Sequence, residues 1–313
     1  MKLVLTKWMF LFFAFGCADS DSQNKSYLTS NPEEDLVLEA KSIDKKEQEI
    51  PIDSSEGYVY SWKETYDYKA ALINRMVVPV GFERVKLEKG SFGDWLRHLP
   101  LEPGKGTVNY FNGDPKFTQK IHAGVIDMDV GTRDLQQCAD AIMRVKAEYH
   151  YQRKEYSDIH FNFTSGDKVS FDDWRKGKKP RISGNNVTFT GFSGNVDNSY
   201  RNFKKYLISI FSYAGTASLE RELSNIELID MQPGDMFIQG GSPGHAVLVM
   251  DMAINKSTDE KLFLLAQSYM PAQDFHILRN LNDKKLDPWY RLDFGNELST
   301  PEWRFDSNDL YRF

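Results

Sequence analysis

Cys138 and His245 are the residues whose types and settings point most directly to chemistry. A cysteine thiolate is a strong nucleophile, and an imidazole can take up the thiol proton near neutral pH. His245 follows a Gly/Pro-rich loop, residues 239–244, and opens an apolar β-branched run. The loop leaves room for a substrate, while a strand would hold the imidazole ring in place. The pair predicts nucleophilic thiol catalysis, and the alternative is a buried structural cysteine.

A helix predicted over residues 135–154 would present the thiol. Asp134 is the expected N-cap, and Gln137 stands three residues later to complete a capping box. Cys138 then lies in the first helical turn, where unpaired N–H groups and the helix dipole favour a thiolate. The sequence therefore predicts a lowered thiol pKa. Positions at three- and four-residue steps mark the inward face: Leu135, Cys138, Ile142, Val145 and Tyr149.

Two strands are predicted to carry the base and its neighbours. Pro233 and Gly234 form a turn before a short strand at residues 236–238. The strand that begins at His245 is followed by a second one, residues 261–269, across a polar loop. This arrangement predicts a hairpin.

Length and composition indicate a globular protein. The chain has 313 residues, of which 41% are hydrophobic and 13% aromatic, so it can bury a sizeable core. The net charge is -6, the pI is about 5.6, and there is no dense Lys/Arg stripe. A nucleic-acid partner is therefore not expected.

The N-terminus carries a predicted export signal. Lys2 and Lys7 precede an apolar run, residues 8–15, which is too short to span a bilayer. Residues 14–17, Ala-Phe-Gly-Cys, resemble the lipobox of bacterial lipoproteins. That resemblance implies a signal peptide over residues 1–17, lipidation of Cys17 and anchoring to the membrane in the bacterial cell envelope. An ordinary signal peptide or an uncleaved anchor is the alternative.

The rest of the chain divides into a tether and one domain. Residues 18–57 are polar and acidic with few aromatics, so they cannot bury enough apolar surface to offset their ordering entropy. They are predicted to be a disordered acidic tether. Aromatic residues and apolar periodicity begin near Tyr58, which predicts a single α+β domain over residues 58–313. Within it, helices are predicted over residues 63–76 and 200–213.

Two resemblances follow from these segments. Residues 137–141, 233–238 and 244–249 resemble the NlpC-type cell-wall cysteine peptidases, a branch of the papain-like superfamily. Residues 85–313 also resemble an uncharacterised family of Bacteroidetes lipoproteins, which carries domain of unknown function 4846. The first resemblance implies an α+β fold with a papain-like core, in which a nucleophile-bearing helix packs on an antiparallel sheet, plus an N-terminal extension.

The peptidase resemblance also implies roles for individual residues. Cys138 becomes the nucleophile and His245 its base, while Gln267 is the first polar residue of the next strand able to share a face with His245. Its amide oxygen would accept the imidazole N–H and set the tautomer. The implied substrate is an amide of cell-wall peptide. The sequence departs from the peptidases at Ala139, where they usually carry serine.

Other constellations predict less. Asp127 and Asp129 fail the calcium-loop spacing, and no Cys or His pair has zinc spacing, so neither a metal nor a cofactor is expected. His276 is a second candidate base, interpreted as a solvated loop residue. Four tryptophans, more typical of a core, could stack on sugars: Trp95, Trp174, Trp289 and Trp303. The alternative function is a non-catalytic envelope lipoprotein that binds glycan or a protein partner.

Overall fold

The computed structural model describes residues 58–192 and 194–313, all of which belong to one compact unit spanning Ile50–Phe313. The unit is a mixed α+β structure built on a large antiparallel sheet. The predicted signal peptide, Cys17 and the predicted tether lie outside the described residues. Within the described part of the chain, no helix combines the length and apolar character needed to cross a bilayer.

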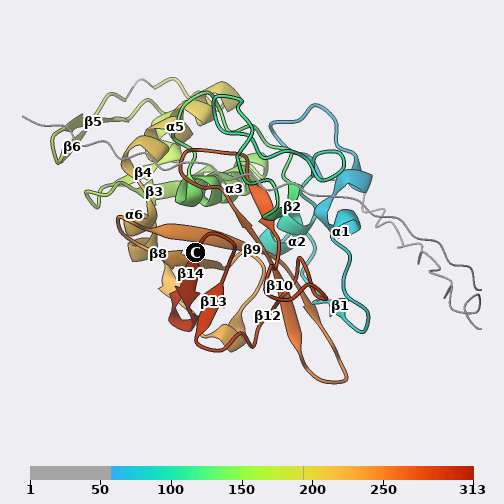
Figure 1. Cartoon of the computed structure of the whole chain (residues 1–313). Helices are drawn as coiled ribbons and strands as arrows, with labels where there is room; N and C mark the ends of the chain where they lie inside the picture. Colours follow the sequence, from blue (N-terminus) through green and yellow to red (C-terminus); the bar gives the residue numbers. More distant parts are fainter. Residues whose placement is uncertain (1–57, 193) are drawn as a thin grey trace, which may run out of the picture. The chain divides into compact units, whose positions relative to one another are not determined.

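Nine antiparallel strands form the sheet at the centre of the unit (Figure 1). Its main path runs β2-β11-β10-β9-β8-β15-β7, with β1 also pairing β9 and β12 also pairing β10. The predicted hairpin is confirmed, because β9 and β10 pair antiparallel across the polar loop. The strands are β1 Glu83–Arg84, β2 His122–Val125, β7 Ser224–Asn225, β8 Met236–Gln239, β9 His245–Ile254, β10 Lys261–Gln267, β11 His276–Leu278, β12 Tyr290–Arg291 and β15 Leu310–Arg312.

Helices and three small hairpins surround this sheet. The helices are α1 Leu72–Arg75, α2 Phe92–Arg97, α3 Cys138–Gln152, α4 Phe171–Arg175, α5 Tyr200–Tyr213 and α6 Thr216–Glu222, with 3-10 turns at Tyr68–Ala70, Tyr156–Asp158, Leu228–Asp230 and Ser307–Asp309. The hairpins pair β3 His160–Asn162 with β4 Lys168–Ser170, β5 Lys179–Ser183 with β6 Asn186–Thr190, and β13 Glu297–Ser299 with β14 Arg304–Asp306.

The two faces of the sheet bury different neighbours. Along β9, Ala246 and Leu248 belong to the core that the helices share, whereas Val247 and Val249 belong to a second core with Phe305 of β14. Helices α2 and α3 pack on β9 from the first side, and β14 packs on β8 from the second. Because strand side chains alternate, odd-numbered residues at the start of β9 point toward the β13–β14 side. His245 is one of them.

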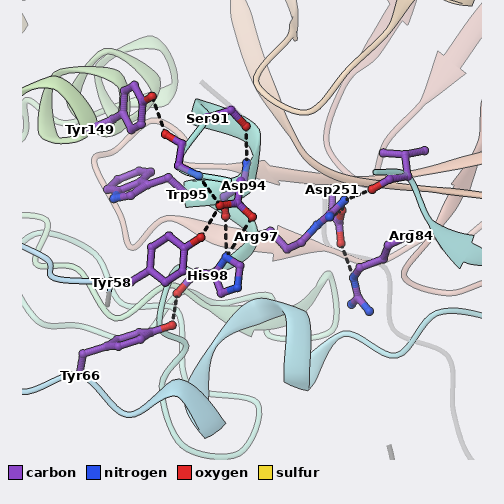
Figure 2. Close-up of polar contacts among 12 residues, drawn as sticks. Tyr58, Tyr66, Arg84, Ser91, Asp94, Trp95, Arg97, His98, Tyr149 and Asp251 are labelled. Carbon is purple, nitrogen blue, oxygen red and sulfur yellow. Dashed lines mark hydrogen bonds and ion pairs between the residues drawn. The ribbon is translucent and has the colours of Figure 1, made fainter. Parts of the chain in front are cut away.

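Asp251, fully buried on β9, ties two outer elements to the sheet (Figure 2). The Nε atom of Arg84, on β1, donates to its Oδ2 atom at 2.7 Å, and the Nε atom of Arg97, on α2, donates to its Oδ1 atom at 2.8 Å. Both carboxylate oxygens are therefore satisfied, which a buried charge requires. This cluster fixes α2 against the strand that begins with His245.

Candidate active site

Cys138 is the first residue of α3, so the helix begins three residues later than predicted. Gln137 is the N-cap, and its backbone N–H donates to the carboxylate of Asp140 at 3.1 Å. The prediction of Asp134 as the N-cap is wrong, because its carboxylate binds other groups. It accepts the N–H of Ala272 at 2.7 Å and the side-chain amide of Gln137 at 3.0 Å. The thiol still lies in the first turn, as the sequence predicts.

The thiol of Cys138 is not activated in the way the helix start suggested. Burial, together with a smaller contribution from Asp140 in the same turn, raises its pKa to about 11. Backbone N–H groups of Cys138, Ala139 and Ala246 act in the opposite direction, but burial outweighs them. The predicted lowered pKa is therefore wrong. At neutral pH the residue is a protonated thiol.

His245 opens β9, as predicted, and its side chain is enclosed. Only 1% of its surface is exposed. The rings of Tyr269, Trp303 and Phe305 lie 4.7, 5.4 and 5.9 Å from its ring, centroid to centroid. Burial lowers its pKa to about 4, although the hydrogen bond to Gln267 opposes this change. The imidazole is therefore neutral at neutral pH.

The predicted contact between His245 and Gln267 is confirmed. The Nε2 atom of His245 lies 2.8 Å from the Oε1 atom of Gln267, which is itself fully buried. An amide oxygen only accepts, so Nε2 carries the proton and Nδ1 keeps its lone pair. The orientation suits a ring that takes up a proton at Nδ1. The catalytic role of both residues stays a prediction.

The glycine-rich loop before His245 is held against α6. The N–H of Gly240 donates to Glu220 at 2.9 Å, and the N–H of Gly241 donates to the hydroxyl of Thr216 at 3.3 Å. Gly244 fits so tightly that a Cβ atom there would lie 2.5 Å from the Thr216 oxygen. The glycines therefore serve close packing that positions His245.

Cys138 and His245 line the same pocket, which has a volume of about 750 Å³. They reach it from different sides, since α3 packs on the helix face of the sheet and the His245 ring points toward β13–β14. Among the described residues, no hydrogen bond joins the thiol to the imidazole. The pocket is lined by residues 134, 135, 137–140, 164, 211, 214–217, 241–245, 269, 270 and 303. None of these is Lys or Arg.

His276 corrects another prediction. It lies on β11 and is fully buried, not on a solvated loop. Its Nδ1 atom is 2.8 Å from the carbonyl oxygen of Asp274, and burial lowers its pKa to about 3. β11 pairs on both sides, with β2 and β10, so it lies inside the sheet, and all three of its residues are buried. It does not line the pocket that contains Cys138.

The acidic residues considered for metal binding form ion pairs. Asp127 pairs with Lys63, and the carboxylate of Asp129 is 2.7 Å from Arg144 and 2.9 Å from Lys204. These cations hold the pKa of Asp129 down to about 2, although burial opposes them.

A second group has ligand atoms within 4.8 Å of one another: His150, Glu155 and Asp158. His150 Nδ1 and Glu155 are already 2.9 Å apart, and Arg153 donates to the other oxygen of Glu155 at 2.7 Å. These pairings account for the cluster without an ion.

The tryptophans divide between core and pocket. Trp95 and Trp289 are buried in the core, where no sugar can reach them. Trp174 is half-buried, and its indole N–H donates to Asn202 at 3.1 Å. Trp303 lines the pocket beside His245 and is the one of the four placed to stack on a ligand there.

Residues 72–312 match the family described as Domain of unknown function (4846). The chain belongs to that family. No match was found to a curated protein or to a solved structure. The description of this family names no activity, so a function must be argued from the pocket.

Sequence reasoning missed two residues behind the pocket of this family member. The side-chain amide of Gln267 donates to Glu302 at 2.6 Å, and Lys116 donates to the same carboxylate oxygen at 2.6 Å. Neither residue belongs to a motif, and 186 positions separate them. Only the paired tail, in which β15 joins β8 and β13–β14 covers the sheet, brings Glu302 to Gln267.

Proposed function

We propose that the chain is a thiol hydrolase that cleaves an amide bond through an acyl-enzyme on Cys138. The observation that carries the proposal is a pocket lined by both Cys138 and His245, in which Gln267 fixes the imidazole with its lone pair on Nδ1. A nucleophile, a base and an orienting group are the parts that such a reaction requires.

The neutral state of both groups determines how the reaction would begin. His245 takes the thiol proton at Nδ1 while the sulfur attacks the carbonyl carbon, because neither group is charged beforehand. The backbone N–H of Cys138, at the start of α3, stabilises the oxyanion, since the N–H of Gln137 already donates to Asp140. The imidazolium then donates its proton to the leaving amine, and water attacks the thioester to restore the thiol. Hydrogen bonds of this kind are often long in an empty site and shorten when substrate binds.

Substrate and location belong to the same proposal. The natural substrate is the peptide of the cell wall. The enzyme is attached to the membrane of the bacterial cell envelope through a lipid on Cys17 and acts there. Both rest on the residue patterns around Cys17, Cys138 and His245. The fold supports the proposal at a coarser level, since a helix that begins with cysteine packs on an antiparallel sheet. A papain-like core is part of what is proposed.

A direct test uses the full chain carrying Cys17→Ala, which contains one thiol. Purified cell-wall sacculi are incubated with this protein, and newly released amino groups are counted. We expect release by the parent protein and none by its Cys138→Ala variant. Equal release by both proteins would refute the proposal, and so would no release from sacculi or from their isolated stem peptides.

The second candidate is a non-catalytic envelope protein that binds glycan or a protein partner in the same pocket. Two observations favour it: burial raises the thiol pKa to about 11, and no hydrogen bond joins Cys138 to His245 within the residues described. Trp303 would then be the ligand-stacking residue. Loss of sacculus binding in Trp303→Ala, with equal binding by Cys138→Ala and no amine release, would establish this function instead.

A further inference from the structure

A closed ring of side chains stands behind His245. The imidazole Nε2 atom meets Gln267 at 2.8 Å, the Gln267 amide meets Glu302 at 2.6 Å, and Glu302 meets Lys116 at 2.6 Å. The Lys116 ammonium lies 5.4 Å from the ring centre of Tyr269, whose ring in turn packs on His245. Five residues from four distant segments therefore close on one imidazole.

The chemistry of Glu302 determines which way the Gln267 amide faces. A carboxylate can only accept hydrogen bonds, so the amide nitrogen must point to Glu302 and the amide oxygen to His245. A neutral amide in a site without such a partner could turn either way. Because Gln267 is fully buried, no solvent competes for either end. The carboxylate thus dictates the proton position on the imidazole through one intervening side chain.

The positive charge of Lys116 offsets the cost of removing the Glu302 carboxylate from water. Its side chain is 6% exposed and that of Glu302 is 22% exposed, so the pair is mostly removed from water. Burial lowers the pKa of Lys116, and the hydrogen bond and charge of Glu302 oppose that change. The ammonium also acts on the base, since its charge lowers the pKa of His245.

A rigid turn holds Glu302 in this position. Between β13 and β14, the N–H of Thr300 donates to the carbonyl of Trp303 at 2.8 Å, and the N–H of Trp303 donates to the Thr300 hydroxyl at 3.1 Å. The indole N–H of Trp303 donates to Gln239 of β8 at 2.9 Å. The same turn therefore places Glu302 against Gln267 and Trp303 against the His245 ring.

We propose that Glu302 and Lys116 are positioning residues that set the tautomer of His245 through Gln267. Neither touches the thiol, and both act by keeping the proton on Nε2 and the lone pair on Nδ1. Their consequence for catalysis rests on the function proposed above. The tautomer itself does not, which allows the two ideas to fail separately.

The test follows the ring nitrogens of His245 by nitrogen-15 NMR in the full chain. Wild type is expected to show the Nε2–H tautomer alone. Glu302→Gln keeps the shape but lets the neighbouring amide turn, so we expect a mixture of both tautomers and a lower His245 pKa, because Lys116 loses its counter-charge. Lys116→Met is expected to raise the His245 pKa, since it removes the repelling ammonium. Lys256→Met, which breaks the exposed pair with Glu83, serves as the control.

The opposite signs in the two variants separate positioning from a merely structural role, which would lower the melting temperature without moving the titration. If the chain is a thiol hydrolase, Glu302→Gln should also slow acylation of Cys138 at least about tenfold. A single Nε2–H tautomer and an unchanged His245 titration in both variants would overturn the proposal. Altered tautomers in a protein that never acylates would support it and count against the hydrolase.

Discussion

The reactivity of the half-buried Cys138 thiol follows from its raised pKa. With a pKa of about 11 it carries about 0.03% thiolate at pH 7.5, against about 10% for a free thiol with a pKa of about 8.5. A more basic thiolate is the better nucleophile. With a Brønsted slope of about 0.4–0.5, the higher pKa makes each thiolate react roughly tenfold faster with a disulfide. The two effects combine to a rate about 20- to 30-fold below that of a free thiol.

The assay measures thiol exchange with 4,4′-dithiodipyridine from about pH 6 to pH 11 on the full chain carrying Cys17→Ala. The same protein unfolded in denaturant supplies the free-thiol reference. We expect the native rate to rise with pH beyond 8.5 without a plateau. Asp140→Asn preserves the acceptor for the Gln137 N–H. Because burial raises the pKa of Asp140 itself, the variant should shift the profile to lower pH in the range where that carboxyl is ionised.

A plateau below pH 8.5 in the native protein would refute this reasoning. It would mean that a thiolate exists beside a charged His245 before any substrate binds. An unchanged profile in Asp140→Asn would show that the carboxylate does not act on the sulfur, and would leave burial as the sole cause of the raised thiol pKa.

Three further perturbations test the structure around the pocket. Asp251→Asn leaves two largely buried arginines without their counter-charge and should lower the free energy of unfolding by about 3–5 kcal/mol in denaturant titrations, whereas Glu83→Gln at an exposed pair should change it by less than about 1 kcal/mol. Gly244→Ala places a methyl group 2.5–2.8 Å from three oxygens and should cost about 1–3 kcal/mol and weaken ligand binding. Gly215→Ala, which also lines the pocket but has open space around it, should leave the free energy of unfolding unchanged. His276 has a pKa of about 3 folded and 6.5 in its unperturbed form, so the unfolded chain binds the proton first. Between about pH 6.5 and pH 3 this group should lower the free energy of unfolding by about 1.4 kcal/mol per pH unit, beside a similar contribution from His245 down to about pH 4, and His276→Leu should remove its share of the slope.

Local signals made much of the frame predictable. The helix α5 has the predicted bounds because its apolar period and its Ser199 cap, which accepts the N–H of Asn202 at 3.2 Å, lie within the segment itself. The start of β9 at His245 and its contact with Gln267 follow from alternation along two adjacent strands. In both cases neighbouring residues carried the information.

The incorrect predictions concern features that depend on contacts between residues far apart in the sequence. The helix predicted over residues 63–76 is reduced to a 3-10 turn and the four-residue α1, because Tyr60, Trp62 and Tyr66 pack as a group beside Trp95 instead. The predicted thiol pKa was wrong because the sequence shows where Cys138 lies in its helix but does not show how far the fold buries it. The Lys116–Glu302 pair joins residues 186 positions apart in the sequence, and no local pattern marks either partner.

The measurement closest to the central claim is trapping of an acyl-enzyme. The full chain carrying Cys17→Ala is mixed with p-nitrophenyl acetate, release of nitrophenol is followed rapidly, and the acetyl group is located by mass spectrometry of peptides. We expect a burst of one nitrophenol per chain, acetyl on Cys138, no burst in Cys138→Ala, and acylation slowed at least about 100-fold in His245→Ala. Absence of acetyl-Cys138, or acylation that is equally fast without His245, would contradict it.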